Sequence, residues 1–252
     1  MPSGNSLAAY STACVVLRGL GEGDLAWLPG DAVSDLQRMF RLTTHDPVVQ
    51  RSRMPQLQAF NRDLLSQVKA LEAILRRSAM MQAVLDRAER LHLPQWYLGA
   101  GGIAQTVWNY LGGNDLTTHI QDLDLVYFEA EDLREESERQ HVENVRVLLQ
   151  DIPVPIDVKN QARVHVWYAA HFGYPILPYH SVEEAINTWP TTATCVGIRV
   201  DAQGFQVYAP YGLNDLFRVI VRPNKVQITE AIYQQKVTRW KACWPNLHII
   251  TW

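Results

Sequence analysis

The sequence predicts an α/β protein in which short strands alternate with helices. Apolar residues recur at spacings of three and four from Leu57 to Leu75, a pattern typical of an amphipathic helix. Further along, the pair Gly101-Gly102 separates a short apolar stretch from a second helical pattern. Two more apolar stretches follow, each carrying aspartate and separated from the other by a polar helix. This order of elements indicates one α/β (α+β) core.

The first 93 residues divide into an extension and a helical segment. Residues 1–46 are rich in glycine, serine and other small residues, so we expect an N-terminal extension with one short helix at residues 35–41. From Pro47 the pattern changes, and helices are expected over residues 57–75 and 79–91. Residues 47–93 therefore begin a domain that runs to residue 252. Its catalytic core is expected at 94–200, and C-terminal strands and a helix at 201–252.

The composition is that of an ordinary folded protein. Hydrophobic residues make up 47% of the 252 and charged residues 19%. A net charge of −3 argues against a protein that coats nucleic acid without specificity. Cys14, Cys195 and Cys243 match neither a disulfide frame nor a zinc motif, which favours a reducing compartment. No apolar run approaches the ~20 residues that span a bilayer, and residues 7–20 are too polar for a signal peptide. We expect a cytoplasmic protein.

Two aspartates lie one residue apart in the apolar stretch QDLDLVYF, residues 121–128. In a strand, side chains at i and i+2 share a face, so Asp122 and Asp124 converge while Leu123 and Leu125 enter the core. Adjacent carboxylates repel each other and are costly to desolvate, and a divalent cation offsets both effects. Oxygen ligands suit Mg²⁺ best. The pair therefore predicts a site for a metal ion and a polyphosphate.

A third carboxylate and the glycine pair extend this predicted site. Asp157 lies at the centre of the next expected strand, residues 154–159. If the two strands are neighbours, the three aspartates form a cluster that can hold two metal ions about 3.5–4 Å apart. Gly101 and Gly102, at a strand-to-helix turn, would let backbone N–H groups approach a triphosphate. Taken singly, the glycines also fit a plain tight turn, and the paired aspartates an exposed strand edge.

The rest of the chain alternates helices and strands. A polar helix at residues 132–149 is expected to expose its acidic residues and to bury Val142, Val145, Leu148 and Leu149. Asn160 can cap a helix that Gly173 ends, and Ser181 with Glu184 fits a capping box. The remaining expected elements are a short strand at 96–98, a helix at 103–111, a helix at 182–189, a hairpin of strands 195–200 and 205–208, a strand at 218–222 and a helix at 230–243.

This order of elements resembles the nucleotidyltransferase superfamily typified by DNA polymerase beta, the CCA-adding enzymes and the aminoglycoside nucleotidyltransferases. The resemblance is stronger to a bacterial nucleotidyltransferase-like family, whose motifs are similar to WYLGAGGIAQTVWNYLGG, IQDLDLVYFE, IDVKNQARVHVWY, WPTTATCVGIRV and APYGLNDLF. It covers the chain from about Pro47 to the C-terminus. The resemblance implies a polymerase beta-like nucleotidyltransferase fold, with a mixed sheet flanked by helices and a helical N-terminal segment.

The resemblance also implies transfer of a nucleoside monophosphate from an NTP to an acceptor, with two Mg²⁺ or Mn²⁺ ions as cofactors. Asp122 and Asp124 would bind the metals, and Asp157 would bind the catalytic one and help deprotonate the acceptor. Gly101 and Gly102 would face the triphosphate. The sequence departs from the family between the glycines and Asp122, where extra residues at 112–119 are expected to form a loop beside the site. A glycine also replaces the serine that many relatives carry at position 102.

Residues near Asp157 each have two interpretations. Lys159 shares the strand face of Asp157 and is either a phosphate ligand or a solvated lysine. Arg163 either clamps phosphate or pairs with an acidic neighbour. His165 is more typical of a packed or surface histidine than of a catalytic base. Trp167 and Tyr168 either stack on a base or pack in the core.

Residues farther along the chain are equally open. Asp215 is more typical of a residue that braces a turn than of a catalytic one. Three threonines line a ligand pocket or begin a strand: Thr191, Thr192 and Thr194. The C-terminal helix either contacts an RNA or protein acceptor or presents a solvated basic face, through Lys236, Arg239, Trp240 and Lys241.

Two functions fit these predictions. The first is a metal-dependent nucleotidyltransferase that moves NMP from an NTP to a hydroxyl or amine and releases pyrophosphate. The alternative is a catalytically silent nucleotide- or partner-binding regulatory module on the same fold. The three carboxylates favour the enzyme, because a module without catalysis has no need for three mutually repelling charges. The acceptor is open among a small molecule, a protein and tRNA, as are the identity of the NTP and the oligomeric state.

Overall fold

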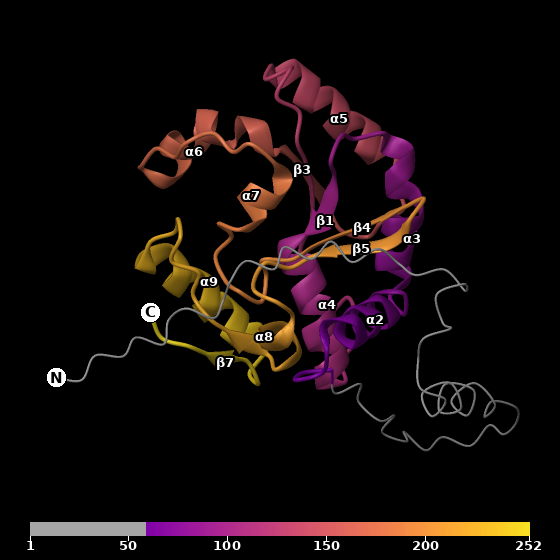
Figure 1. Cartoon of the computed structure of the whole chain (residues 1–252), viewed down its shortest axis with the longest axis vertical. Helices are drawn as coiled ribbons and strands as arrows, with labels where there is room; N and C mark the ends of the chain where they lie inside the picture. The colour runs from indigo at the N-terminus through magenta and orange to yellow at the C-terminus, as the bar shows by residue number, and fades with distance from the viewer. Residues whose placement is uncertain (1–58) are drawn as a thin grey trace, which may run out of the picture.

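A computed structural model describes residues 59–252, whose arrangement is shown in Figure 1. The helices are α2 (Leu64–Leu75), α3 (Ala79–Ala88), the 3₁₀ turn η2 (Glu89–Leu91), α4 (Ala100–Gly112), α5 (Glu135–Leu148), the 3₁₀ turn η3 (Gln161–Arg163), α6 (Val164–Phe172), α7 (Val182–Ile186), α8 (Asn214–Phe217) and α9 (Glu230–Cys243). The strands are β1 (Tyr97–Gly99), β2 (Leu123–Tyr127), β3 (Ile156–Asn160), β4 (Gly197–Asp201), β5 (Gly204–Tyr208), β6 (Ile220–Val221) and β7 (His248–Ile249). The expected extension, residues 1–46 with its short helix, lies outside the described residues.

The first described helix, α2, begins later than the apolar periodicity predicts. The Asp63 carboxylate accepts a hydrogen bond from the backbone N–H of Ser66 at 2.9 Å and caps the helix at residue 64. Phe60 lies in a turn, and Asn61 has a φ of +59°. The prediction that Phe60 is helical is therefore wrong, because the N-cap fixes the helix start after it. Residues 57–58 lie outside the described part, and α3 with η2 covers 79–91 as predicted.

Five strands form one mixed sheet in the order β3-β2-β1-β4-β5. β2 and β3 are parallel and connected through α5, whereas the other neighbouring pairs are antiparallel. The hairpin of β4 and β5 has its expected turn, in which Asp201 pairs with Gly204 at a φ of +95°. The predicted fold class, a mixed sheet flanked by helices, is confirmed.

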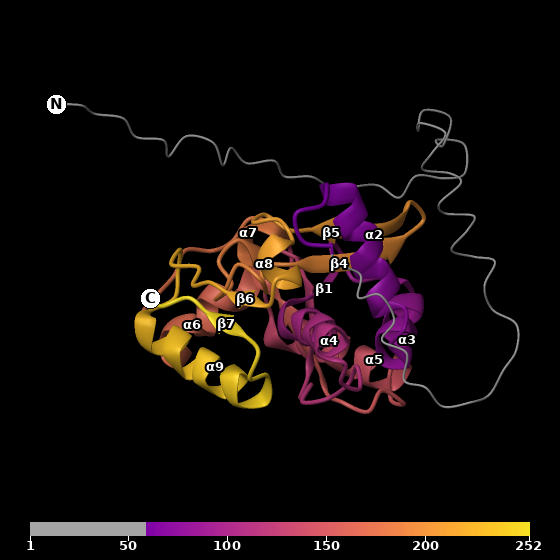
Figure 2. The ribbon, with the colours of Figure 1, turned by 90° about the horizontal axis from the view of Figure 1, so that it is seen from below.

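The two faces of the sheet pack against different helices. Leu123 and Leu125 of β2 are fully buried in a core shared with α2, α3 and α4. Val126 belongs to a second core on the other face, together with Tyr168 of α6 and Val182 of α7. In Figures 1 and 2, α6 and α9 lie on the opposite side of the molecule from α2 and α3. Because Asp124 alternates with Leu125, it faces the side of α6 and α9.

Helix α5 buries a narrower stripe than its sequence predicts. Within its span only Val145 is buried, and Val142 is 37% exposed. The prediction that Val142 joins the buried stripe is wrong. α5 contacts the edge strand β3 and the short turn η2, so only a thin band of its surface is covered.

The caps of α6 and α7 largely follow the sequence. Asn160 Oδ1 accepts a hydrogen bond from the N–H of Ala162 at 3.0 Å and caps η3, which leads directly into α6, and Gly173 ends α6 with a φ of +84°. Ser181 Oγ accepts from the N–H of Glu184 at 3.0 Å. The Glu184 carboxylate, however, accepts from the N–H of His180 rather than of Ser181, so the capping box is only half formed. α7 then ends at Ile186, three residues earlier than expected.

Two C-terminal elements were not predicted from the sequence. α8 is a single turn, and β7 pairs with β6 in a separate two-stranded sheet. Both are too short to show a hydrophobic period, and the predicted strand at 218–222 reduces to β6. α9 has its predicted bounds. None of the helices in residues 59–252 is long and apolar enough to cross a bilayer.

Candidate active site

Three aspartates lie at close positions on two neighbouring strands. Asp122 immediately precedes β2, and Asp124 is the second residue of that strand. In the parallel register of β2 and β3, Asp124 lies opposite Asp157. The two strands are thus neighbours, as the predicted acidic cluster requires. The role of these residues as metal ligands stays a prediction.

The surroundings of Asp124 favour its protonated form. Burial, followed by the negative charges of Asp122 and Asp157, raises the pKa of Asp124 to about 7. Lys236 of α9 and a hydrogen bond from the backbone N–H of Gly101 act in the opposite direction. Lys236 is itself desolvated, which lowers its pKa, while Asp124 favours its charged form. Burial and the two neighbouring carboxylates together therefore outweigh the effect of Lys236 and Gly101 on Asp124.

The two basic residues predicted near Asp157 have different surroundings. Lys159 Nζ donates a hydrogen bond to the Asp157 carboxylate at 2.7 Å. Arg163 is only 7% exposed, and its guanidinium pairs with Glu138 and donates to the backbone carbonyl of Leu133 at 2.8 Å. Of its two interpretations, the structure shows the pairing with an acidic neighbour, and we leave Arg163 out of the candidate site.

Both predicted glycines lie in the first turn of α4 rather than in a loop before it. Gly99 is the N-cap residue. A Cβ added to Gly101 would meet the side-chain nitrogen of Gln105 at 3.2 Å. A Cβ on Gly102 would lie 2.4 Å from a methyl carbon of Leu123, so Gly102 allows α4 to pack closely on β2. Of these two glycines, only Gly101 lines the cavity described in the next paragraph.

A cavity of about 730 Å³ joins the aspartates to α4, α6 and α9. This volume is typical of sites for small ligands. Its polar part includes Gly101, Asp122, Asp124, Asp157 and Lys159. α6 and α9, which supply much of the remaining lining, lie near each other in both views of the molecule (Figures 1 and 2). The cavity therefore combines an acidic cluster with an aromatic and basic wall.

Aromatic and amide side chains form this wall. Trp167 and Tyr168 of α6 both line the cavity, and Tyr168 also packs in the second core, whereas His165 does not line it. Sequence reasoning missed Gln105, Gln161, Phe172, Trp189, Gln227, Ile228, Ile232 and Gln235, which also line it. They come from several separate segments, and although Gln105, Gln161 and Trp189 lie within the motif stretches, no local pattern shows that these side chains share one cavity.

The four residues singled out on α9 have two kinds of surroundings. Lys236, Arg239 and Trp240 line the cavity, with Lys236 Nζ 5.3 Å from the centroid of the Trp240 ring. Lys241 instead donates hydrogen bonds to the backbone carbonyls of Pro245 and Leu247, at 2.7 and 2.6 Å. α9 therefore does not present a purely solvated basic face, because Lys236 and Arg239 line the cavity.

The threonines and Asp215 mainly brace the local structure. Thr194 lines the cavity and shares a 2.8 Å hydrogen bond with the hydroxyl of Thr191. Thr192 Oγ1 donates to Asp215 at 2.6 Å, and Arg222 pairs with the same carboxylate at 2.9 Å. Asp215 thus has the bracing role that its sequence context favours.

The extra residues at 112–119, between Gly102 and Asp122, do not line the cavity. Asn109 Nδ2, near the end of α4, donates to the backbone carbonyl of Thr118 at 2.7 Å. Asn109 Oδ1 accepts from Trp244 Nε1, also at 2.7 Å. The loop is thereby held at the C-terminal end of α4, away from Gly101. The expectation that it forms part of the site's surroundings is wrong, because α4 carries the chain away from the aspartates before the loop begins.

The part of the chain that forms this cavity matches a known family of sequences. A sequence model of a family described as Nucleotidyltransferase matches residues 86–249, a span that includes the aspartates and all residues lining the cavity. The chain belongs to this nucleotidyltransferase family. The predicted family is therefore confirmed.

A solved structure supports the same assignment. An NMR structure whose title states that it reveals a CCA-adding enzyme head domain aligns with a TM-score of 0.61 and 26% sequence identity. The alignment covers 73% of this chain and 96% of that one. Among curated proteins, no sequence matches the chain. The polymerase beta-type nucleotidyltransferase fold predicted from the motifs is confirmed.

The nucleotidyltransferase fold implies a divalent metal, and the donor chemistry of this chain fits one. The three aspartates offer carboxylate oxygens, the donors that Mg²⁺ and Mn²⁺ prefer. Burial, followed by the charges of Asp122 and Asp157, raises the pKa of Asp124, and a cation would offset both effects. Within residues 59–252, no three acidic, histidine or cysteine side chains are grouped closely enough to hold an ion as they stand. Lys159 Nζ bonds one oxygen of the Asp157 carboxylate, and a cation bound there would compete with it for that oxygen.

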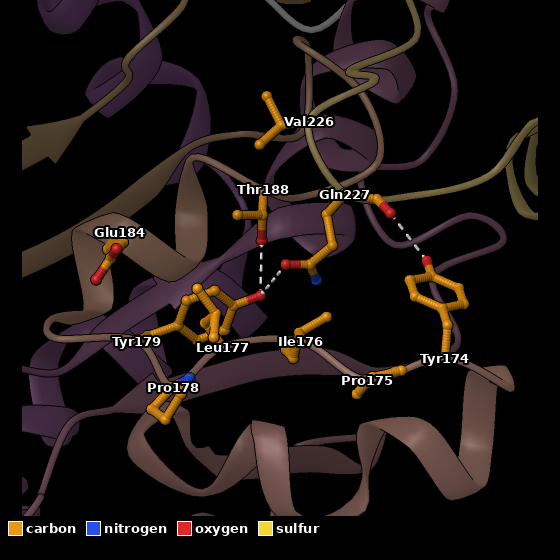
Figure 3. A pocket seen from close by; sticks show the side chains of 10 residues that line it. All are labelled: Tyr174, Pro175, Ile176, Leu177, Pro178, Tyr179, Glu184, Thr188, Val226 and Gln227. Atoms are coloured by element: carbon orange, nitrogen blue, oxygen red, sulfur yellow. Dashed lines mark hydrogen bonds between the residues drawn. The ribbon is translucent and has the colours of Figure 1, made fainter.

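A second hollow of about 360 Å³ adjoins the cavity of this nucleotidyltransferase. Tyr179, Thr188 and Gln227 line both spaces. Figure 3 shows the Tyr179 hydroxyl bonded to Thr188 Oγ1 at 2.9 Å and to Gln227 Oε1 at 2.8 Å. Tyr174 adds a hydrogen bond to the Gln227 backbone carbonyl at 2.9 Å. Hydrogen-bonded side chains thus form the partition between the two spaces.

Proposed function

We propose that this protein is a metal-dependent nucleotidyltransferase that moves a nucleoside monophosphate from an NTP to a hydroxyl or amine acceptor. The observation that carries the proposal is the register that sets Asp124 opposite Asp157, with Asp122 two residues away, in one cavity. Family membership supports transfer of this kind in general. The metal, the residues and the acceptor are the parts that need experiment.

Asp122, Asp124 and Asp157 would hold two Mg²⁺ or Mn²⁺ ions. Such ions, when bound, neutralise the charge that develops on the transferring and leaving phosphates. A site made only of carboxylate oxygens matches these hard cations. A cation would offset both the desolvation of Asp124 and its repulsion by Asp122 and Asp157.

The triphosphate would lie between the start of α4 and the basic residues of the cavity. The backbone at Gly101 and the positive end of the α4 dipole favour an anion. Lys236 and Arg239 of α9 line the same cavity and add positive charge from the other side. Lys159 would exchange the Asp157 carboxylate for a phosphate oxygen as the metal binds. The chain therefore supplies both an acidic and a basic part for one ligand.

The reaction would be an in-line displacement. The acceptor oxygen or nitrogen attacks the α-phosphorus, a new P–O or P–N bond forms, and the bond from the α-phosphorus to the bridging oxygen breaks. Pyrophosphate leaves with that electron pair, and Asp157 accepts the proton of the acceptor.

The alternative is a regulatory module that binds nucleotide or a partner without turnover. The ion pair between Lys159 and Asp157 is the observation that favours it, because one carboxylate is engaged in the structure as it stands. The two functions differ in one measurable property, the covalent transfer of label.

The test uses α-labelled ATP, GTP, CTP and UTP with Mg²⁺ or Mn²⁺, the full chain and a cell extract as the source of acceptor. The extract is separated afterwards into small-molecule, protein and RNA fractions, so the labelled fraction identifies the acceptor class. Asp122→Ala and Asp157→Ala are expected to abolish transfer. Asp86→Ala, on the exposed surface of α3, is the matched control and should retain it.

Two results would contradict the proposal in different ways. Transfer that persists in both Asp122→Ala and Asp157→Ala would exclude these residues as the active site. Metal-dependent NTP binding without labelled product in any fraction would favour the regulatory module.

A further inference from the structure

Three residues of α4 line the cavity: Ala100, Gly101 and Gln105. The backbone N–H groups of the first two are already engaged within the protein. The N–H of Ala100 donates to the backbone carbonyl of Val196 at 3.1 Å, and the N–H of Gly101 donates to the carboxylate of Asp124. A helix start usually holds an anion through such N–H groups. Where α4 lines the cavity, these backbone donors are therefore already used.

The side-chain amide of Gln105 is the α4 donor that is left. Gln105 is only 7% exposed, and its Oε1 is buried. The polar atom that it presents to the cavity is therefore the nitrogen Nε2. A Cβ added to Gly101 would lie 3.2 Å from Nε2, which places this nitrogen beside the first turn of the helix. No residue in the described part of the chain accepts a hydrogen bond from Nε2.

The surroundings of Nε2 favour a negatively charged acceptor. An amide nitrogen can only donate hydrogen bonds. The positive end of the α4 dipole lies at the same turn, and Lys236 and Arg239 of α9 line the cavity as cations. Since the carboxylates in the cavity are the proposed metal ligands, the anionic oxygens that are left for Nε2 are those of the phosphates.

Resting on the proposed function, we propose that Gln105 Nε2 donates a hydrogen bond to a phosphate oxygen of the NTP and so positions the triphosphate on α4. α4 then holds phosphate through a side chain one turn beyond Gly101, because the backbone N–H of Gly101 serves Asp124. The glycine leaves room for this amide, since a larger residue at position 101 would press against Nε2. The contact is to phosphate, so it acts on any polyphosphate, with or without a nucleoside.

The experiment measures calorimetrically how the full chain binds two probes in the presence of Mg²⁺. The probes are inorganic tripolyphosphate and the NTP that binds most tightly among the four. Gln105→Met removes the amide and keeps an unbranched side chain of similar length. Loss of one hydrogen bond to a charged group should weaken the binding of both probes by about ten- to a hundredfold. Gln105→Glu should weaken both further, because a carboxylate repels phosphate.

Gln206 offers a matched control. It is 2% exposed and, like Gln105, has a buried Oε1 without a hydrogen-bond partner among the described residues, but it does not line the cavity. Its Nε2 donates to the backbone carbonyl of Gln203 at 3.5 Å. Gln206→Met should therefore keep the wild-type affinity for both probes. Circular dichroism and thermal melting check folding, and the nearly isosteric Gln105→Glu carries the test if Gln105→Met does not fold.

The outcomes separate this inference from the proposed function. Unchanged affinity for both probes in the Gln105 variants would overturn the inference alone, because the amide would then face water only. Weaker NTP binding with unchanged tripolyphosphate binding would also overturn it, by assigning the contact to the nucleoside. So would a wild-type protein that binds NTP but not tripolyphosphate. Failure of the wild-type protein to bind any NTP overturns the proposed function, and the phosphate contact with it.

Discussion

Among single residues, Asp124 has the least favourable electrostatic surroundings in the site. It is partly buried, and the charges of Asp122 and Asp157 act on it together. The pKa of Asp124, raised to about 7, lies above the ordinary value of 3.8. The folded protein therefore keeps a proton that the unfolded chain releases between these two pH values. In the absence of a cation, the negative charge of Asp124 lowers the stability of the folded protein. Such costs are typical of functional sites, where perturbed pKa values cluster.

The first prediction follows from that linkage. Because the native state binds the extra proton, the stability of the metal-free protein should fall as pH rises from about 4 to about 7. Asp124→Asn should raise the melting temperature in EDTA at pH 8 and change it little at pH 4, while abolishing nucleotide transfer. Added Mg²⁺ should stabilise the wild-type protein more than the variant. A melting temperature at pH 8 that is lower in the variant would contradict this account.

The two glycines give a second prediction, because they serve different purposes. Gly102→Ala would place a Cβ 2.4 Å from a methyl carbon of Leu123, whose side chain is fully buried. Overpacking of this kind costs about 1–3 kcal/mol in the free energy of unfolding. Gly101→Ala meets only the Gln105 side chain at 3.2 Å and should leave stability nearly unchanged while weakening NTP binding. Chemical denaturation and calorimetric titration measure the two effects, and equal stability losses in both variants would refute the distinction.

Among the elements, α5 has a role beyond connecting β2 to β3. Its Glu138 accepts a hydrogen bond from the backbone N–H of Asn160, at the end of β3, at 2.7 Å, and it pairs with the buried guanidinium of Arg163. The side chains of Arg163 and Glu138 are only 8% and 13% exposed. The helix is therefore tied to the end of the strand that carries Asp157, and this ion pair orients the strand rather than a ligand.

The third prediction concerns that ion pair. Removing one partner of a buried pair leaves the other charge uncompensated, at a cost of about 3–5 kcal/mol. Glu138→Ala should therefore lower the free energy of unfolding by about this amount. Glu135→Ala breaks the Arg139–Glu135 pair, whose side chains are 66% and 70% exposed, and should change stability by less than about 1 kcal/mol. Similar melting curves for the two variants would show that the Arg163 pair is not structurally important.

At the scale of the whole molecule, the cavity depends on α9, which comes from the far end of the sequence and packs against α4. Trp240 and Trp244 both pack against Trp108 of α4, with centroids 5.4 and 5.7 Å apart. Asn109 joins this contact to the loop after α4 through the hydrogen bonds to Trp244 and Thr118. The position of Lys236 over the aspartates therefore depends on packing at the opposite end of α4.

The fourth prediction tests this dependence. Asn109→Leu keeps a similar volume but leaves the Trp244 N–H and two loop carbonyls without their partner, so it should destabilise the protein by about 1–3 kcal/mol. Hydrogen exchange should accelerate in residues 113–120 and 244–252, and NTP affinity should fall although Asn109 does not line the cavity. Unchanged exchange in both segments would contradict the coupling.

The sequence by itself determined the elements with strong local signals. Period-two and helical patterns gave the strands and long helices, and local caps at Asn160 and Gly173 gave their ends. The same alternation placed Asp122 and Asp124 on one face, because strand geometry follows from the backbone alone. Short elements such as α8 and β7 carry no period, so they escaped prediction.

Tertiary structure alone decided which residues share the cavity. Arg163 was paired with Glu138 and removed from the site, whereas Lys236 and Trp240 were brought to the cavity from more than a hundred residues beyond Asp124. These outcomes depend on how α5 and α9 pack, and packing is a property of surfaces that no local window of sequence contains. The acidic pair was local and thus predictable. Its basic and aromatic counterpart was long-range and became visible only in the fold.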